Sequence, residues 1–250
     1  MLQRAIDINS SLGIAHSVMA QLETDRGQAQ DAVARLLGCL KRTPNAPDLY
    51  AGLVYACRFC GLLDASLSAH RQAQRFSSKV PTSVAQTYFV MGEYERSLET
   101  TYGDFGYIGA LALYSLGRDA EATALVSERQ QLRQTPLARN FLAGLRALME
   151  ERLEECVRMA DETRETFHLR GEELFYISRH YARAGALDTA TAALRDVVET
   201  GYFNYPALAK DPWLAVLRGQ TAFEDVLKTA EARHRAAEAL FLKAAGPFEG

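Results

Sequence analysis

Cys57 and Cys60 form a C-x-x-C pair, a motif that can hold zinc or carry out thiol exchange. Zinc would need two more ligands nearby, and thiol exchange would be expected beside a strand-containing, thioredoxin-like pattern. Cys57 instead occupies an expected core position just before a helical turn. With Cys39 and Cys156, the four cysteines are dispersed without a framework of several pairs, which suits a reducing compartment. We expect four free thiols.

Two Glu-x-x-His pairs, Glu165 with His168 and Glu231 with His234, resemble halves of a di-iron carboxylate site. Such a site also needs one glutamate from each of two further helices. We expect the first pair at the end of a helix and the second on the terminal helix, well apart in the fold. The sequence therefore predicts no metal site and no cofactor.

The other sequence signals of catalysis are missing. No G-x-S-x-G, H-E-x-x-H, phosphate-binding G-x-x-x-x-G-K or dinucleotide-binding glycine motif occurs. The formal net charge of −3 gives no attraction toward nucleic acid or an anionic membrane. We predict that the chain is not an enzyme and binds neither nucleic acid nor membranes.

No targeting or membrane-spanning segment is expected. The longest apolar runs, such as residues 107–114, are far shorter than the roughly 20 residues of a spanning helix. Charges occupy the first ten residues, where a secretion signal would carry its apolar core. We expect a soluble, cytoplasmic protein.

The elements that position these residues follow from residues 174–200, where two apolar helical stripes are separated by Gly185. Glu151 and Gly117 precede Gly185 at successive intervals of 34 residues, and Gly27 and Gly61 are also 34 apart. Gly92 lies only 25 residues before Gly117. The pattern predicts repeated helix-turn-helix units, with a shortened third unit whose second helix is interrupted at Tyr102–Asp104.

A 34-residue period of helix pairs resembles the tetratricopeptide repeat. The resemblance implies an all-α, right-handed solenoid of antiparallel helix pairs with a C-terminal helical cap. Residues 12–200 would form about six repeats, and residues 201–250 a non-repeat helical capping unit. Residues 1–11, with Ala5, Ile8 and Ser10 in register, look like the end of a repeat's second helix. We infer from them that the chain is a segment of a longer array or multidomain protein, with a short native start as the alternative.

The end of the chain resembles a narrower group. Gly201-Tyr-Phe, Pro206-Ala-Leu, Asp211-Pro-Trp-Leu, Leu217-Arg and Phe223 are similar to the ending of C-terminal tetratricopeptide arrays in multidomain bacterial signalling proteins. Those arrays follow Ser/Thr kinase, cyclase or winged-helix DNA-binding domains. The resemblance implies a regulatory segment whose parent activity lies outside these residues.

In the tetratricopeptide family, ligands lie in the concave groove made by the first helix of each repeat. From the matching positions we predict a peptide-binding groove whose principal residues are Tyr55, Arg58, Phe89, Tyr107, Tyr114, Phe141, Phe175 and Arg179. The other matching positions hold Asp48, Ala51, Gln86, Leu111, Leu145 and Leu148. Buried aromatic side chains would supply most of the affinity, and the two arginines would select acidic groups. The competing interpretation is that half of these aromatics pack between repeats.

One known partner class is not expected. The family's clamp for a chaperone C-terminal carboxylate uses Lys and Asn at positions that hold Ser17 and Gln21 in this sequence.

We therefore predict a protein–protein interaction scaffold that binds a peptide or partner segment in the concave groove. The alternative is a small-molecule sensor gating an attached kinase, cyclase or DNA-binding domain, which a closed apolar pocket near the third and fourth repeats would favour. A further prediction is self-association through the N-terminal end, where a missing helix would leave an apolar face.

Overall fold

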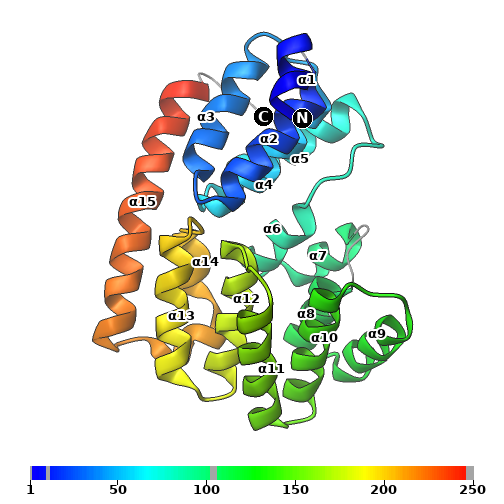
Figure 1. The fold of residues 1–250 in the computed structure, drawn as a ribbon, viewed down its shortest axis with the longest axis vertical. Helices are drawn as coiled ribbons and strands as arrows, with labels where there is room; N and C mark the ends of the chain where they lie inside the picture. Colours follow the sequence, from blue (N-terminus) through cyan, green and yellow to red (C-terminus); the bar gives the residue numbers. More distant parts are fainter. Residues whose placement is uncertain (1, 10–11, 102–105, 246–250) are drawn as a thin grey trace.

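The computed structural model describes residues 2–9, 12–101 and 106–245, and in these ranges the chain is helical with no β-strand (Figure 1). The all-α class predicted from the sequence is confirmed. The helices are α1 (Leu2–Ile8), α2 (Gly13–Asp25), α3 (Ala29–Leu40), α4 (Pro47–Phe59), α5 (Leu63–Phe76), α6 (Val84–Met91), α7 (Tyr94–Thr100), α8 (Tyr107–Ser115), α9 (Asp119–Gln131), α10 (Pro136–Met149), α11 (Leu153–Thr166), α12 (Gly171–Arg183), α13 (Leu187–Glu199), α14 (Tyr205–Lys210), the 3-10 helix η1 (Pro212–Leu217) and α15 (Thr221–Ala245).

The helices from α2 to α13 pack in the order of the chain. We call α2, α4, α6, α8, α10 and α12 the first helices, and the helices that directly follow them the second helices. Each first helix packs against the second helix after it, and also against the next first helix. Contacts therefore run mainly between neighbours along the chain, as they do in repeat proteins.

The turns between first and second helices share one backbone conformation. Glycine has a positive φ at five of them, and Glu151 has a φ of 56° at the sixth. Among the described residues Glu151 is the only non-glycine residue with a positive φ. This conformation is unfavourable for residues with a Cβ atom, which explains the recurring glycine. The turn glycines are Gly27, Gly61, Gly92, Gly117 and Gly185.

Small residues on the second helices let the helix pairs approach closely. Ser66 on α5 donates a hydrogen bond to the carbonyl of Val54 at 2.8 Å, and Ser97 on α7 donates to the carbonyl of Ala85 at 2.9 Å. In both cases the acceptor lies 12 residues earlier, on the preceding first helix. The serine thus satisfies its buried hydroxyl against the helix it packs on.

The third unit has short helices, since α6 has eight residues and α7 has seven. The interruption expected at Tyr102–Asp104 lies outside the described residues. Ser10, which the sequence places at the end of a repeat's second helix, also lies outside the described residues.

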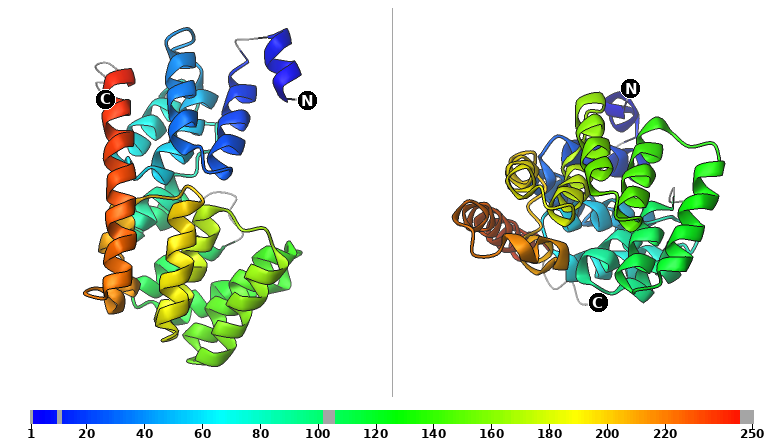
Figure 2. Two further views of the ribbon diagram at one scale, coloured as in Figure 1. Left: turned by 60° about the vertical axis from the view of Figure 1, so that its left-hand side comes forward. Right: turned by 90° about the horizontal axis from the view of Figure 1, so that it is seen from below.

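Figures 1 and 2 show the N-terminal helices α1 to α5 at one end of the molecule and the helices from α6 to α14 at the other. Helix α15 runs along the side of both groups and packs against α3 as well as α13 and α14. Asp211 caps η1 by accepting a hydrogen bond from the amide of Trp213 at 2.8 Å, and Pro212 follows it at the first helical position. An aspartate cap followed by proline at the first position is a favourable start for a helix.

None of the helices in the described ranges has the length and apolar character needed to cross a membrane.

Candidate functional site

The first helices enclose a pocket of about 220 Å³, which we call the inner pocket. Every first helix contributes to it, directly or through the residue that begins it, and in the described chain no second helix does. Its lining residues are Gln21, Tyr55, Gln86, Tyr107, Ile108, Thr135, Leu137, Ala138, Phe141, Arg170, Glu172, Glu173 and Tyr176.

The repeat register explains which side chains reach the inner pocket. Gln21, Tyr55 and Gln86 each stand six residues before the turn glycine of their unit. Equivalent positions on α2, α4 and α6 therefore face one point. From α8, α10 and α12 it is the N-terminal turns that face the pocket, so side chains distant in sequence converge there.

One wall of the inner pocket is aromatic. The ring of Tyr107 packs edge to face against Phe141, with centroids 5.0 Å apart, and against Tyr176 at 5.6 Å. Behind this wall, the Tyr107 hydroxyl lies 2.9 Å from Nε2 of His180. Burial, and then the nearby charge of Arg179, lowers the pKa of His180 to about 3. The imidazole supporting the wall is therefore neutral at physiological pH.

The opposite side of the pocket is charged and ties α12 to α2. Arg170 donates to Asp25 at 2.8 Å and to Glu173 at 2.9 Å, and Glu173 also accepts from the backbone N–H of Arg170 at 2.9 Å. The hydroxyl of Tyr55 donates to the second oxygen of Asp25 at 2.6 Å. These contacts connect the first and last units across the pocket.

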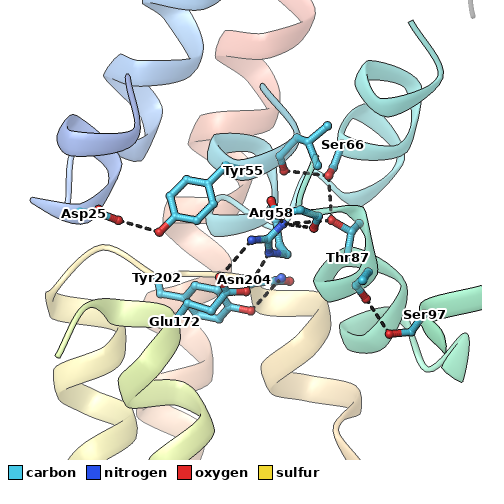
Figure 3. Close-up of polar contacts among 12 residues, drawn as sticks. Asp25, Tyr55, Arg58, Ser66, Thr87, Ser97, Glu172, Tyr202 and Asn204 are labelled. Carbon is cyan, nitrogen blue, oxygen red and sulfur yellow. Dashed lines mark hydrogen bonds and ion pairs between the residues drawn. The ribbon is translucent and has the colours of Figure 1, made fainter. Parts of the chain in front are cut away.

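A buried ion pair lies directly beside the inner pocket (Figure 3). Arg58 donates to the two carboxylate oxygens of Glu172 at 2.7 and 3.0 Å, and its third donor nitrogen reaches the carbonyl of Ser83 at 2.8 Å. Burial alone would lower the pKa of Arg58, but the charge and hydrogen bonds of Glu172 outweigh burial and raise it. The wholly buried guanidinium thus stays charged and paired.

The same region contains contacts between the N-terminal helices and the residues that follow α13. The amide of Phe203 donates to the carbonyl of Phe59 at 3.0 Å. A Cβ atom placed on Gly201 would lie only 2.2 Å from the Cα of Gly27. We call this region the junction, and define it by Gly27, Arg58, Phe59, Glu172, Gly201 and Phe203. It closes the array on itself.

Three of the eight residues predicted for the groove line the inner pocket: Tyr55, Tyr107 and Phe141. The two arginines do not. Arg58 belongs to the junction, and Arg179 donates to Asp211 at 2.7 Å with its guanidinium carbon 4.2 Å from the Trp213 ring centroid. Both are wholly buried and already paired with a carboxylate of this chain. Neither guanidinium is therefore exposed to an acidic group of a partner.

The other three predicted aromatics make contacts within the protein. Phe175 stacks on Tyr202 with centroids 5.2 Å apart, and Phe89 lies 5.4 Å from Tyr94. Both are buried, whereas Tyr114 is half-buried and packs edge to face against Trp213 at 6.0 Å. These contacts are those of the competing interpretation, in which the aromatics pack between helices.

Sequence reasoning missed the charged side of the pocket, made by Arg170, Glu172 and Glu173. A signal for one of them was available. Glu172 stands 13 residues before Gly185, where the second unit has Asp48 13 residues before Gly61. Arg170 and Glu173 had no such signal, because they gain their position from contacts made at the N-terminus of α12.

All four cysteines are buried free thiols. Burial raises the pKa of Cys57 to about 12, and burial followed by the neighbouring Cys57 raises that of Cys60. A protonated, buried thiol is a poor nucleophile and a poor metal ligand. The C-x-x-C pair is thus explained by packing at the end of α4.

The two Glu-x-x-His pairs stay apart in the fold. Glu165 and His168 are exposed at the end of α11, while Nδ1 of His234 lies 2.8 Å from the carbonyl of Cys60 and Glu231 pairs with Arg235 at 2.5 Å. Within the described ranges, no three potential metal ligands gather into one group.

No protein-family model matches the chain, and no curated protein matches it either.

Proposed function

We propose that this chain is a non-enzymatic, tetratricopeptide-type solenoid that binds a segment of another protein in the concavity of its first helices. The observation that carries the proposal is the composition of the inner pocket, which all six first helices line. No single helix pair could form this pocket, because its walls come from all six first helices. The 34-residue spacing of the turns supports the same reading of the architecture.

The burial of several predicted groove residues limits how such a segment would bind. Arg58, Phe175 and Arg179 are wholly buried, so a partner would meet the rim of the pocket first. Gln21, Thr135 and Arg170 are exposed, while Tyr55, Gln86 and Glu173 are half-buried. The proposed contact surface is therefore the inner pocket and this rim, which is smaller than the groove predicted from the sequence.

A second candidate is a small-molecule sensor that gates an attached domain. The size of the inner pocket favours it, since about 220 Å³ is less than the space that drug-sized ligands usually occupy and could hold a small metabolite. In either case the resemblance to the C-terminal arrays of bacterial signalling proteins would make the chain a regulatory segment of a larger protein.

The test fills the inner pocket by enlarging a half-buried residue that lines it. Gln86→Trp would place an indole in the inner pocket, and Gln72→Trp would place one on α5, a second helix, at an equally half-buried position. We expect proteins captured from a lysate by the wild type and by Gln72→Trp to be lost with Gln86→Trp. Equal capture by all three forms would contradict the proposal. A metabolite that raises the melting temperature of the wild type but not of Gln86→Trp would favour the sensor.

Self-association through the N-terminal end is kept as a separate proposal. Ile8 on α1 is 79% exposed and Ile14 on α2 is 50% exposed, so two large apolar side chains lie close together in sequence on this end. Sedimentation over a range of concentrations tests it, with Ile14→Glu expected to abolish any dimer. A mass that stays monomeric at every concentration would contradict it.

A further inference from the structure

The charges around the inner pocket do not balance. Asp25, Glu172 and Glu173 supply three carboxylates, against the two guanidinium groups of Arg58, which pairs with Glu172, and Arg170, which pairs with Asp25 and Glu173. Both guanidiniums are already held by those carboxylates. A carboxylate accepts up to about four hydrogen bonds, so the acidic groups keep acceptor capacity after these contacts.

The phenols at the pocket respond to this excess of negative charge. Burial is the largest cause that raises the pKa of Tyr55, followed by the charges of Glu172 and Asp25, while Arg58 opposes them with a smaller effect. The pKa of Tyr176 is also raised, first by burial and then by the charge of Glu172, while Arg58 and Arg179 oppose the shift. At each of the two hydroxyl groups, the largest contribution from a charged side chain is thus that of the Glu172 carboxylate.

Aromatic rings add a further feature that suits a cation. Tyr55, Tyr107, Phe141 and Tyr176 line the pocket, and a cation over an aromatic ring is attracted by the ring's negative face. The hydroxyl of Tyr176 is closed to solvent, so the contribution of this residue comes from its ring.

Of the three helix N-termini that face the pocket, those of α10 and α12 already have negative or capping groups in place, although a free N-terminus favours anions. On α12 the first turn holds Glu172 and Glu173, which already offset its positive end. On α10, Thr135 accepts a hydrogen bond from the amide of Ala138 at 3.2 Å. An added anion would therefore compete with two carboxylates and a cap that are in place.

We infer that the inner pocket receives the cationic side chain of a lysine or arginine, presented by an extended segment of the partner protein. The inference rests on the proposed function, and adds the chemistry that the pocket selects. The pocket volume of about 220 Å³ suits one long side chain rather than a whole peptide, so the rest of the segment lies on the rim. Glu173 is the half-buried carboxylate that meets the cation.

The test is a selection of random heptapeptides displayed on phage, using the intact chain as bait and Gln86→Trp as the counter-bait. We expect the recovered sequences to share a lysine or arginine at one position. A synthetic peptide with norleucine in place of that lysine, which keeps the chain length and loses the ammonium group, should bind at least about tenfold more weakly.

Two protein variants test whether Glu173 causes the preference for lysine over norleucine. Glu173→Gln keeps the size of the side chain and its hydrogen bond to the backbone N–H of Arg170, and should erase the preference for lysine over norleucine. Glu165→Gln, an exposed change on α11, removes the same charge far from the pocket and should leave the preference intact. An equal loss in both variants would overturn the inference, because the preference would then reflect net charge.

The outcomes separate the inference from the function on which it rests. Recovered peptides that share an acidic or apolar residue would overturn the cationic ligand and leave peptide binding standing. If the intact chain enriches no sequence over Gln86→Trp, both the inference and the proposed function fail.

Discussion

On α4 and α12, side chains of the junction and of the inner pocket are close neighbours in sequence but differ in exposure. Arg58 and Glu172 pair with each other in the interior, whereas Tyr55 and Glu173, three residues and one residue away, are half-buried at the pocket. All four come from first helices. Some side chains of these helices therefore hold the fold together, and only the others are left for a ligand.

The largest expected effect comes from breaking the junction. Arg58→Met should lower the free energy of unfolding by about 3–5 kcal/mol, because Glu172 would remain buried without its partner. Denaturation in urea measures the loss. Arg118→Met is the matched control, since Arg118 pairs with Glu121 at the surface, and should leave the midpoint unchanged. Similar midpoints for the two variants would contradict the structural role of the junction.

The pocket wall should make the protein sensitive to acid. Burial lowers the pKa of His180 to about 3 from its ordinary 6.5, so below pH 6.5 the unfolded chain binds a proton that the folded chain does not. Stability is then complete above about pH 6.5 and falls by roughly 1.4 kcal/mol per pH unit, or about 3 kcal/mol by pH 4.

Urea denaturation at several pH values checks this prediction. His180→Gln removes the titrating group and should flatten the slope between pH 6 and pH 4. If the free energy of unfolding of the variant falls with pH as steeply as that of the wild type, groups other than His180 cause the acid sensitivity.

Gly201 and Gly185 adopt similar backbone conformations in different surroundings. Gly201 and Gly185 have φ values of 104° and 85°, but only Gly201 meets another backbone, at Gly27, while no atom lies within 4 Å of a Cβ on Gly185. Gly185→Ala should cost about 1 kcal/mol from backbone strain. Gly201→Ala should cost about 2 kcal/mol more, because the junction must open to admit the methyl group. Equal losses of stability in the two variants would contradict this, because the contact between Gly201 and Gly27 would then adjust at little cost in free energy.

The smallest expected effect is a gain in stability. Glu151 has the same turn conformation without being glycine, and Glu151→Gly should stabilise the fold by about 0.5 kcal/mol as the strain is relieved. Glu162→Gly, an exposed change inside α11, should instead destabilise by about 1 kcal/mol. Thermal denaturation distinguishes the two, and a loss in both variants would contradict the assignment of strain to Glu151.

The sequence predicts the helices and turns well because both depend on local signals. A glycine at a fixed interval and an apolar stripe need only neighbouring residues, and the turns at Gly27 and Gly185 obey both. The pairing of Arg58 with Glu172 joins residues 114 positions apart. It depends on small rotations added over many helices, which no local pattern records.

The candidate site shows the same division. Tyr55, Tyr107 and Phe141 could be placed on the concave side because their register repeats, and they line the inner pocket. Arg58 and Arg179 share that register but are taken up by Glu172 and Asp211. Residue type and register alone do not say whether a concave charge faces a partner or another part of the same chain.

Calorimetric titration can measure directly whether the Glu173 carboxylate in the inner pocket binds the cation of a peptide. In a double-mutant cycle, the selected lysine peptide and the same peptide with norleucine in place of lysine are each titrated into the wild type and Glu173→Gln. The account predicts that the lysine contributes at least about tenfold to affinity in the wild type and almost nothing in Glu173→Gln, so that the two changes are strongly coupled. Additive effects, with the lysine contributing equally to both proteins, would contradict it.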